Sequence, residues 1–224
     1  MVSYTDYKKE KPEFELDVMW DLNRFPKEFL NRGFSVETLK HFRVGMSGDE
    51  ILIPYYRDFN KPIELLGYQR RWYSPDRGVR NSKSFDKEHY LYNLNFDYAY
   101  TVLVEGQSDV WRLYQYGYNA TALMGLTISD WQVEQLSKFE RVYLALDNDE
   151  AGRKGTEVVN FCLSKQTEIL LIPYDAKDPG ECGRKKWKKA FESATDYLVY
   201  SMEMSMEWDA YLDVREEALG HLRK

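Results

Sequence analysis

Four short apolar runs alternate with helix-like segments, and this alternation constrains the fold more than any other feature of the sequence. The apolar runs are residues 100–104, 120–124, 142–146 and 168–173. The segments with helical patterns are residues 109–116, 130–139 (capped by Ser129) and 150–164. Strands that alternate with helices in this way pair in parallel, with right-handed crossovers between them. The sequence therefore predicts a doubly wound α/β domain.

Acidic residues stand where two of the predicted strands end. Glu105 follows the first run, and Asp147 and Asp149 follow the third. Successive side chains of a strand alternate between its faces, so Asp147 and Asp149 point the same way. The carboxyl ends of parallel strands meet at one edge of the sheet, where ligand sites of such folds form. We therefore expect these three carboxylates to lie near one another.

Neighbouring carboxylates indicate a cation. They repel each other unless a positive charge lies between them, and Mg²⁺ takes oxygen ligands while keeping waters and substrate phosphates. An Asp-x-Asp pair by itself is weak evidence, because many such pairs are hydrated turn residues. A generic Rossmann-like domain is the simplest alternative. It does not explain acids at two strand ends without a glycine-rich dinucleotide loop.

Several of these segments resemble the TOPRIM domain, a fold shared by primases, type IA and type II topoisomerases and some nucleases. The matching segments are Val-Glu-Gly-Gln-Ser-Asp-Val at 104–110, Met-Gly-Leu at 124–126 and Leu-Asp-Asn-Asp-Glu-Ala-Gly-Arg at 146–153. Their spacing is closest to the DnaG-type primases of bacteria and phages. The resemblance continues into 175–181, where the family often has Asp-Pro-Asp. Gly180 replaces the second Asp here, so the metal site is expected to be one ligand short, or Glu181 substitutes.

The residues that precede Glu105 indicate which of the families with a TOPRIM domain this sequence resembles. Residues 50–57 and 62–72 have the pattern of a hairpin around 58–61. Together with Asn81-Ser82 and a Lys-x-x-x-Leu-Tyr segment at 87–92, they resemble the amino-terminal half of the DnaG-type polymerase core. Topoisomerases and TOPRIM nucleases lack this neighbour.

The resemblance covers residues 25–194 and implies a division of the chain. A small basic α+β subdomain is expected over 1–97, a TOPRIM domain with a Rossmann-like parallel sheet over 98–195, and a helical tail over 196–224. The resemblance also implies a fold class, α/β with a parallel sheet preceded by a smaller α+β unit.

The front part of the chain is rich in cations interleaved with aromatic residues. The cations are Lys61, Arg70, Arg71, Arg77, Arg80, Lys83 and Lys87. The aromatic residues are Tyr68, Trp72, Tyr73 and Tyr90. Cations hold phosphates and aromatic faces stack bases, the usual combination for single-stranded nucleic acid. Composition alone favours a solvated basic face with aromatic core residues, whereas the family resemblance favours nucleic-acid binding.

The resemblance implies a role for each candidate residue. Glu105 lies nearest the chemistry, as proton acceptor or metal ligand, and Asp147 and Asp149 are catalytic metal ligands. The metal set is completed by Asp178 and Glu181, with Asp109 as a supporting acid. The residues expected to hold nucleic acid or triphosphate are Arg70, Arg71, Lys83, Lys87, Arg153 and Lys154.

The implied activity is synthesis of short RNA primers on single-stranded DNA from nucleoside triphosphates during replication. The cofactor would be Mg²⁺ or Mn²⁺ and not zinc, because two cysteines, Cys162 and Cys182, are too few for a structural zinc site. One alternative is a TOPRIM nuclease that uses the same acids for hydrolysis. The other is a catalytically silent replisome adaptor that binds nucleic acid.

DnaG-type primases ordinarily carry a zinc ribbon and a helicase-binding domain, and this sequence shows neither. The resemblance therefore implies a phage-like polymerase core. A separate zinc-ribbon protein and a replicative helicase are its expected partners.

Charge and hydropathy exclude other classes of protein. The formal net charge of the 224 residues is −6, which excludes a histone-like nonspecific binder. No signal-peptide core and no apolar run of membrane-spanning length occurs in the sequence. We therefore expect no membrane partner and a cytoplasmic protein of a bacterial or phage-infected cell.

A lysine-rich stretch follows the third acidic segment. Lys185, Lys186, Lys188 and Lys189 flank Trp187. A solvated helix face with Trp187 turned inward is the simpler interpretation. A second contact to template or nucleotide phosphates is the alternative.

Overall fold

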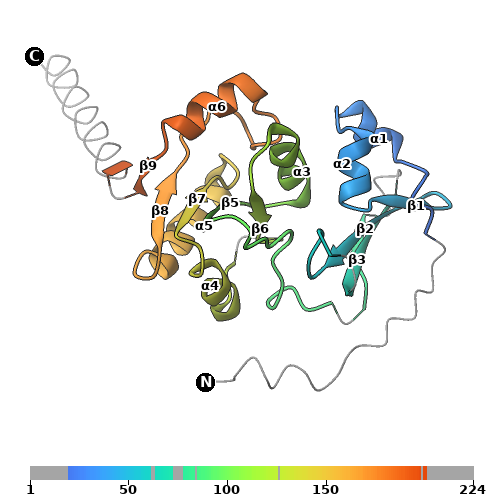
Figure 1. Cartoon of the computed structure of the whole chain (residues 1–224), viewed down its shortest axis with the longest axis horizontal. Coiled ribbons are helices and arrows are strands. Elements are labelled where there is room, and N and C mark those ends of the chain that lie inside the picture. Colours follow the sequence, from blue (N-terminus) through green and yellow to red (C-terminus); the bar gives the residue numbers. More distant parts are fainter. Residues whose placement is uncertain are drawn as a thin grey trace, which may run out of the picture.

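The computed structural model describes residues 20–61, 64–72, 78–83, 85–125, 127–197 and 199–200, and it contains two sheets (Figure 1). The first is a four-stranded antiparallel sheet with the order β1-β2-β3-β4. The second has five strands in the order β6-β5-β7-β8-β9, and the first four of these run parallel. The predicted fold class is therefore confirmed. The predicted domain boundaries at 97/98 and 195/196 stay a prediction.

The amino-terminal lobe combines two short helices with the antiparallel sheet. Its elements are α1 (Lys27–Asn31), α2 (Val36–His41), β1 (Gly45–Ser47), β2 (Glu50–Tyr56), β3 (Leu65–Trp72) and β4 (Val79–Asn81). The predicted hairpin corresponds to β2 and β3, which pair antiparallel. Strands β1 and β4 were not predicted, because three residues are too few to show a strand period.

The second lobe contains the predicted alternation. Its elements are β5 (Tyr100–Val104), α3 (Gln107–Tyr116), β6 (Ala120–Ala122), α4 (Asp130–Leu136), β7 (Arg141–Leu144), α5 (Glu150–Leu163), β8 (Glu168–Leu171), α6 (Arg184–Glu192) and β9 (Thr195–Asp196). Three strands end two residues before the apolar runs do. After β7, for example, Ala145 and Leu146 are buried beyond the strand's end, and each belongs to one of the two apolar clusters, so their apolar character reflects burial in the core. The antiparallel edge strand β9 was not predicted.

Both faces of the parallel sheet are covered, because its side chains alternate between two apolar clusters. Val102 and Tyr143 belong to the cluster that includes Val110 of α3 and Trp187 of α6. Leu103 belongs to the other cluster, with residues of α4 and α5. The doubly wound arrangement thus leaves the carboxyl ends of the strands as the edge where loops gather (Figure 1).

A shared aromatic core joins the two lobes. Trp111 of α3 packs edge-on against Phe29 and Phe34 of the amino-terminal lobe, with ring centroids 5.0 and 5.5 Å apart. Its indole N–H donates a hydrogen bond of 2.9 Å to the hydroxyl of Tyr92. Trp111 is 1% exposed, so the contact is dry. The lobes are therefore held in one arrangement by burial as well as by the chain between them.

Some predicted features lie outside the described residues. These are Tyr73, Arg77 and, in the predicted tail, residues 198 and 201–224. Within the described part of the chain, no helix is long and apolar enough to cross a bilayer.

Candidate acidic site

Three acidic loops meet at the carboxyl edge of the parallel sheet. Glu105 directly follows β5, and Asp147 and Asp149 follow β7, its parallel neighbour. The loop at 175–181 follows β8, which pairs with β7 on the other side. Strand β6 lies on the opposite side of β5, so the strand order reverses at β5 and β7. Such a switch point is where open α/β sheets bind ligands.

The acids of these loops act on one another electrostatically. The pKa of Glu105 is raised by burial and then by the nearby charges of Asp147 and Asp149. The pKa of Asp147 is raised by burial, then by Asp178 and Asp149. Lys177 opposes the shift in both pKa values. Mutual repulsion of this kind requires short separations, so the fold brings together the acids that the sequence placed far apart.

Asp109 lies beneath these loops as a buried acid. It is 6% exposed, and one carboxylate oxygen accepts a hydrogen bond of 3.1 Å from the backbone N–H of Gly180. Burial and the charges of Asp178 and Asp147 raise the pKa of Asp109 to about 7. Asp109 therefore links α3 to the third acidic loop.

Gly180 is the position at which the sequence departs from the family pattern. A Cβ atom there would lie 2.9 Å from an oxygen of Asp109 and 3.1 Å from one of Asp178. Any larger residue would crowd both carboxylates. In this chain the third loop therefore presents a backbone donor to Asp109 where the family often presents a second acid.

The other two predicted ligands, Asp149 and Glu181, each take part in a short-range hydrogen bond with a residue three positions away. Asp149 is the N-cap of α5, and its side chain accepts a hydrogen bond of 2.8 Å from the N–H of Gly152. An Asp at this position is a strong helix start, which explains why α5 begins at Glu150. Glu181 is exposed, and its N–H donates to the side chain of Asp178 at 2.8 Å.

The raised pKa of Asp109 predicts a dependence of stability on pH. The folded chain holds the proton up to about pH 7, whereas the unfolded chain releases it near the ordinary value of 3.8. Stability should therefore fall as the pH rises from about 4 to about 7, by up to about 4 kcal/mol from this group. Urea unfolding of the metal-free protein at about pH 5 and about pH 8 measures the difference.

Asp109→Asn provides the control for this prediction. The amide still accepts from Gly180 but does not titrate, so the variant should lose most of the pH dependence. The comparison also distinguishes the contribution of Asp109 from that of His41. Burial lowers the pKa of His41, so His41 makes stability rise with pH, whereas Asp109 makes it fall. An equal pH dependence in both proteins would contradict the prediction.

The predicted nucleic-acid-binding cations differ in how much of their charge is already paired. Arg71 forms an ion pair of 2.6 Å with Glu28, and Arg70 lies 3.6 Å from Glu50. Lys83 and Lys87 are exposed. The two lysines therefore offer the freer charge for a phosphate.

The prediction that Tyr68 and Tyr90 stack bases is wrong. Tyr68 is 7% exposed and Tyr90 is 2% exposed, and the hydroxyl of Tyr90 donates to the carbonyl of Tyr56. Their aromatic faces lie in the core, as composition alone had favoured. Trp72 is only partly buried.

Arg153 and Lys154 lie in the first turns of α5, next to the Asp149 cap. The guanidinium of Arg153 donates to the carbonyl of Asn148 at 3.3 Å. Lys154 pairs with Glu150 at 2.7 Å, both side chains being well exposed. Such exposed pairs contribute little to stability, so Lys154 can exchange its partner for a phosphate.

Arg112, which sequence reasoning missed, joins the site to the other lobe. Its guanidinium donates to three backbone carbonyls, at 3.2 Å to Gly180, 3.0 Å to Gly33 and 2.6 Å to Arg32. It also lies 4.4 Å from the ring centroid of Phe34. Carbonyl partners leave no trace in a sequence, so no pattern could have indicated this role.

Lys177 and Met124 lie in segments that resemble the TOPRIM domain, but no role was predicted for either residue. Lys177 is the cation that opposes the raised pKa values of Glu105 and Asp147, and its carbonyl accepts a hydrogen bond of 2.7 Å from the N–H of Asn148. Met124 has a positive φ of 63° and donates its N–H to the carbonyl of Glu105 at 3.0 Å. A single lysine inside an acidic segment was the available signal for Lys177.

Comparisons with known proteins agree with this geometry. Residues 102–182 match the family described as Toprim-like. The DNA primase of Clostridium acetobutylicum is 32% identical over 141 residues, which are 56% of this chain and 23% of that protein. The zinc-binding and RNA polymerase domains of the Aquifex aeolicus primase superpose with a TM-score of 0.68 at 20% identity, covering 81% of this chain and 58% of that one.

Residues 102–182 are therefore similar to the Toprim-like family, a class of α/β domain. More particularly, the chain has the fold of a DnaG-type primase core, and its sequence is similar to that of DNA primases. A further solved structure, the DnaG primase catalytic domain bound to single-stranded DNA, superposes with a TM-score of 0.62 at 20% identity, covering 79% of this chain and 74% of that one. The chain spans about a quarter of the length of the curated relatives it matches.

Proposed function

We propose that this chain is the catalytic core of a primase, a nucleotidyltransferase that synthesises short RNA primers on single-stranded DNA. The observation that carries the proposal is the electrostatic coupling of acids from three separate strand-end loops at the switch point of the sheet. The relatives named DNA primase and the DnaG domain bound to single-stranded DNA support it.

A divalent cation, Mg²⁺ or Mn²⁺, is part of this proposal. In the described part of the chain, no three His, Cys, Asp or Glu side chains already lie close enough together to hold one metal ion. The donor set nevertheless fits, because hard cations take carboxylate oxygens and the raised pKa values report acids that a positive charge would relieve. Glu105, Asp147, Asp149 and Asp178 would hold the cation, with Glu181 adjoining. When bound, it would supply neutralisation of phosphate charge.

The side chains have separate tasks in this scheme. Glu105 is half-buried with a raised pKa, which suits a group that accepts the proton of an attacking hydroxyl. Asp109 orients the third loop through the N–H of Gly180. Lys83, Lys87, Arg153 and Lys154 are exposed cations that would hold template or triphosphate oxygens, with Arg70 and Arg71 beside them.

One assay tests the proposal against its alternatives. The purified chain is incubated with single-stranded DNA, labelled nucleoside triphosphates and Mg²⁺ or Mn²⁺, with and without a zinc-ribbon protein. Short labelled oligomers support the primase. Shortened template would instead indicate a TOPRIM nuclease, and binding without either product would indicate an adaptor.

Removing an acid should weaken metal binding without unfolding the protein. Asp147→Asn relieves the repulsion that raises the pKa of Glu105, so the metal-free variant should be as stable as the wild type or slightly more so. Its affinity for Mn²⁺ should fall, because one oxygen ligand loses its charge. Calorimetric titration and thermal melting measure the two effects. Unchanged Mn²⁺ affinity in the Asp147→Asn, Asp149→Asn double variant would remove both residues from the metal site.

Binding of single-stranded DNA should depend on salt through the exposed lysines of the amino-terminal lobe. Each phosphate contact contributes about 0.7 to the slope of log K against log salt for a single strand. Lys83→Gln with Lys87→Gln should therefore reduce the slope by about 1.4. The matched control is Lys40→Gln with Lys165→Gln, also exposed lysines. Equal slopes for the two double variants would exclude this surface.

The wider setting is proposed from the same relationship. The chain would work in the cytoplasm of a bacterium or of a phage-infected cell, alongside a zinc-ribbon protein that reads the template and a replicative helicase. Co-purification of each candidate partner with the full chain is the direct measurement.

A further inference from the structure

Helix α6 is rich in positive charge, and most of this charge lies at the amino end, where a helix tolerates it least. Its nine residues include five exposed cations, which are Arg184, Lys185, Lys186, Lys188 and Lys189. Three of them fill the first turn, which contains no acidic residue, and the N-cap Gly183 supplies no side-chain hydrogen bond. The amino end of a helix carries partial positive charge, so cations there are unfavourable.

The cations of α6 also repel one another. Lys185 and Lys189 are four residues apart, as are Arg184 and Lys188, and like charges at this spacing destabilise a helix. The ion pair recorded for α6 in the described part of the chain joins Lys188 to Glu192 at 3.7 Å, with both side chains exposed. The chain as a whole has a net charge of −6, so this concentration of cations on one helix is a local conflict between the sequence and the stability of the helix. Conflicts of this kind are expected at functional surfaces.

The inward face of α6 fixes the direction of these charges. Trp187 is fully buried against Tyr118 and Tyr174, and Ala190 is 8% exposed. The lysines on either side of Trp187 therefore face solvent. No large apolar side chain accompanies them outward, which argues against insertion into a lipid surface.

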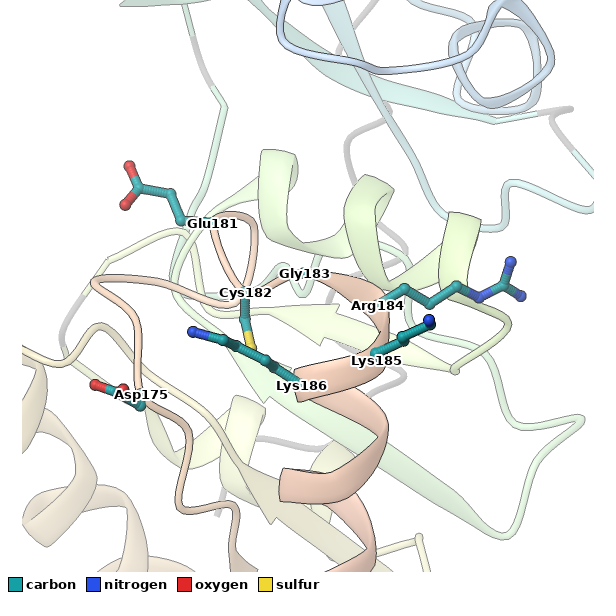
Figure 2. Close-up of a pocket in the computed structure, with 7 residues that line it drawn as sticks. All are labelled: Asp175, Glu181, Cys182, Gly183, Arg184, Lys185 and Lys186. Atoms are coloured by element: carbon teal, nitrogen blue, oxygen red, sulfur yellow. The ribbon is translucent and has the colours of Figure 1, made fainter.

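The helix begins directly beside the acidic site. Glu181, which stands in the third acidic loop, is three residues before Arg184. A pocket of about 410 Å³ lies at this junction, lined by Asp175 and residues 181–186. Figure 2 shows Lys186 extending toward the side of Asp175 and Glu181, whereas Arg184 and Lys185 extend away from these acids. Most of the first-turn charge is therefore directed outward.

We propose that the outer face of α6 binds the sugar-phosphate backbone of a single-stranded nucleic acid whose adjoining segment lies at the acidic site. This inference rests on the proposed primase function and extends it to a second phosphate-binding surface. From Arg184 to Lys189 the helix rises about 7.5 Å. That length covers about two or three phosphates of a strand that keeps the stacked, B-like rise of about 3.4 Å per nucleotide.

The test combines affinity with stability in one triple variant of exposed lysines, Lys185→Gln, Lys188→Gln and Lys189→Gln. It leaves Lys186, which extends toward the acids, unchanged (Figure 2). Its salt slope for a single-stranded DNA, measured without nucleotides, should fall by about 2 from the wild-type value, because about three contacts at 0.7 each are lost. Its melting temperature should equal or exceed that of the wild type, because repulsion within the helix is removed. The variant with Arg at the same three positions keeps the charge and should keep the slope.

The control variant replaces Lys40, Lys138 and Lys165 with Gln, three exposed lysines elsewhere on the fold. A triple α6 variant with the wild-type slope would overturn the inference while leaving the proposed function intact. A wild-type chain that binds no single-stranded DNA would instead overturn the proposed function. Binding to phosphatidylglycerol vesicles that depends on α6, with DNA binding unaffected, would assign the surface to lipid and also overturn the inference.

Discussion

Replacing Glu105 with Gln should lower the rate of primer synthesis by about 10²–10⁴-fold, the usual effect of losing a positioned general base. Glutamine keeps the shape of the side chain but neither accepts the proton nor carries the charge. Glu105 is the acid that ends β5, and Asp147 and Asp149 raise its pKa from across the sheet edge. Affinity for single-stranded DNA should stay close to the wild-type value, because it depends on cations elsewhere on the fold.

Oligomer synthesis at saturating Mn²⁺ and DNA binding measure the two effects on the same preparation. The matched control is Glu157→Gln on α5, an exposed glutamate that should change neither quantity. A wild-type rate in Glu105→Gln would remove Glu105 from the chemistry. It would also favour the adaptor over the primase.

Gly152→Ala should destabilise the protein by about 3 kcal/mol, at the upper end of the usual effect of overpacking. A Cβ atom at this position would lie 1.9 Å from the carbonyl oxygen of Asp147 and 2.7 Å from its carbonyl carbon. These are backbone atoms, so relief requires the first turn of α5 to move away from β7. Glycine to alanine within a helix ordinarily stabilises it by about 1 kcal/mol, so the expected sign is reversed.

Urea unfolding compares this variant with Gly125→Ala. Gly125 has no positive φ, and among the residues that the structure describes no neighbour lies within 4 Å of a Cβ built there, so this control should change stability little. Because the moving turn carries the Asp149 cap, Gly152→Ala should also weaken Mn²⁺ binding. A variant as stable as the wild type would show that the approach of α5 to Asp147 is not close in solution.

The order of strands and helices in the second lobe could be predicted because each element carries its own local signal. Apolar runs, the Ser129 cap and the acids that follow β5 and β7 all lie within a few residues of the element they mark. The same locality explains the prediction of Glu105, Asp147 and Asp149 as neighbours, because parallel strands end at one edge. Their catalytic and metal-binding roles stay a prediction.

Features that depend on contacts between distant segments could not be predicted. Tyr68 and Tyr90 look the same in sequence whether they face bases or the core. Their burial involves residues far away in the sequence, since Tyr68 contacts Trp20 and Tyr90 contacts Tyr55. The pairing of Arg71 with Glu28 joins residues 43 positions apart. Position 180 could be interpreted only in part from the sequence. The absence of the acid that the family often has there was visible, but the hydrogen bond from the N–H of Gly180 to Asp109 was not.

Arg112 holds the two lobes together in a way that is insensitive to the identity of its partners. Its three hydrogen bonds end on main-chain carbonyls, which every amino acid has. At this contact, the residues that supply the carbonyls do not need a particular side chain. A chimera that takes its amino-terminal lobe from a distant relative should therefore keep this contact, provided that its loop follows the same path. Lobe exchange would then be limited by the contacts that do depend on side chains, such as the fit around Trp111 and the stacking of Tyr114 on His41.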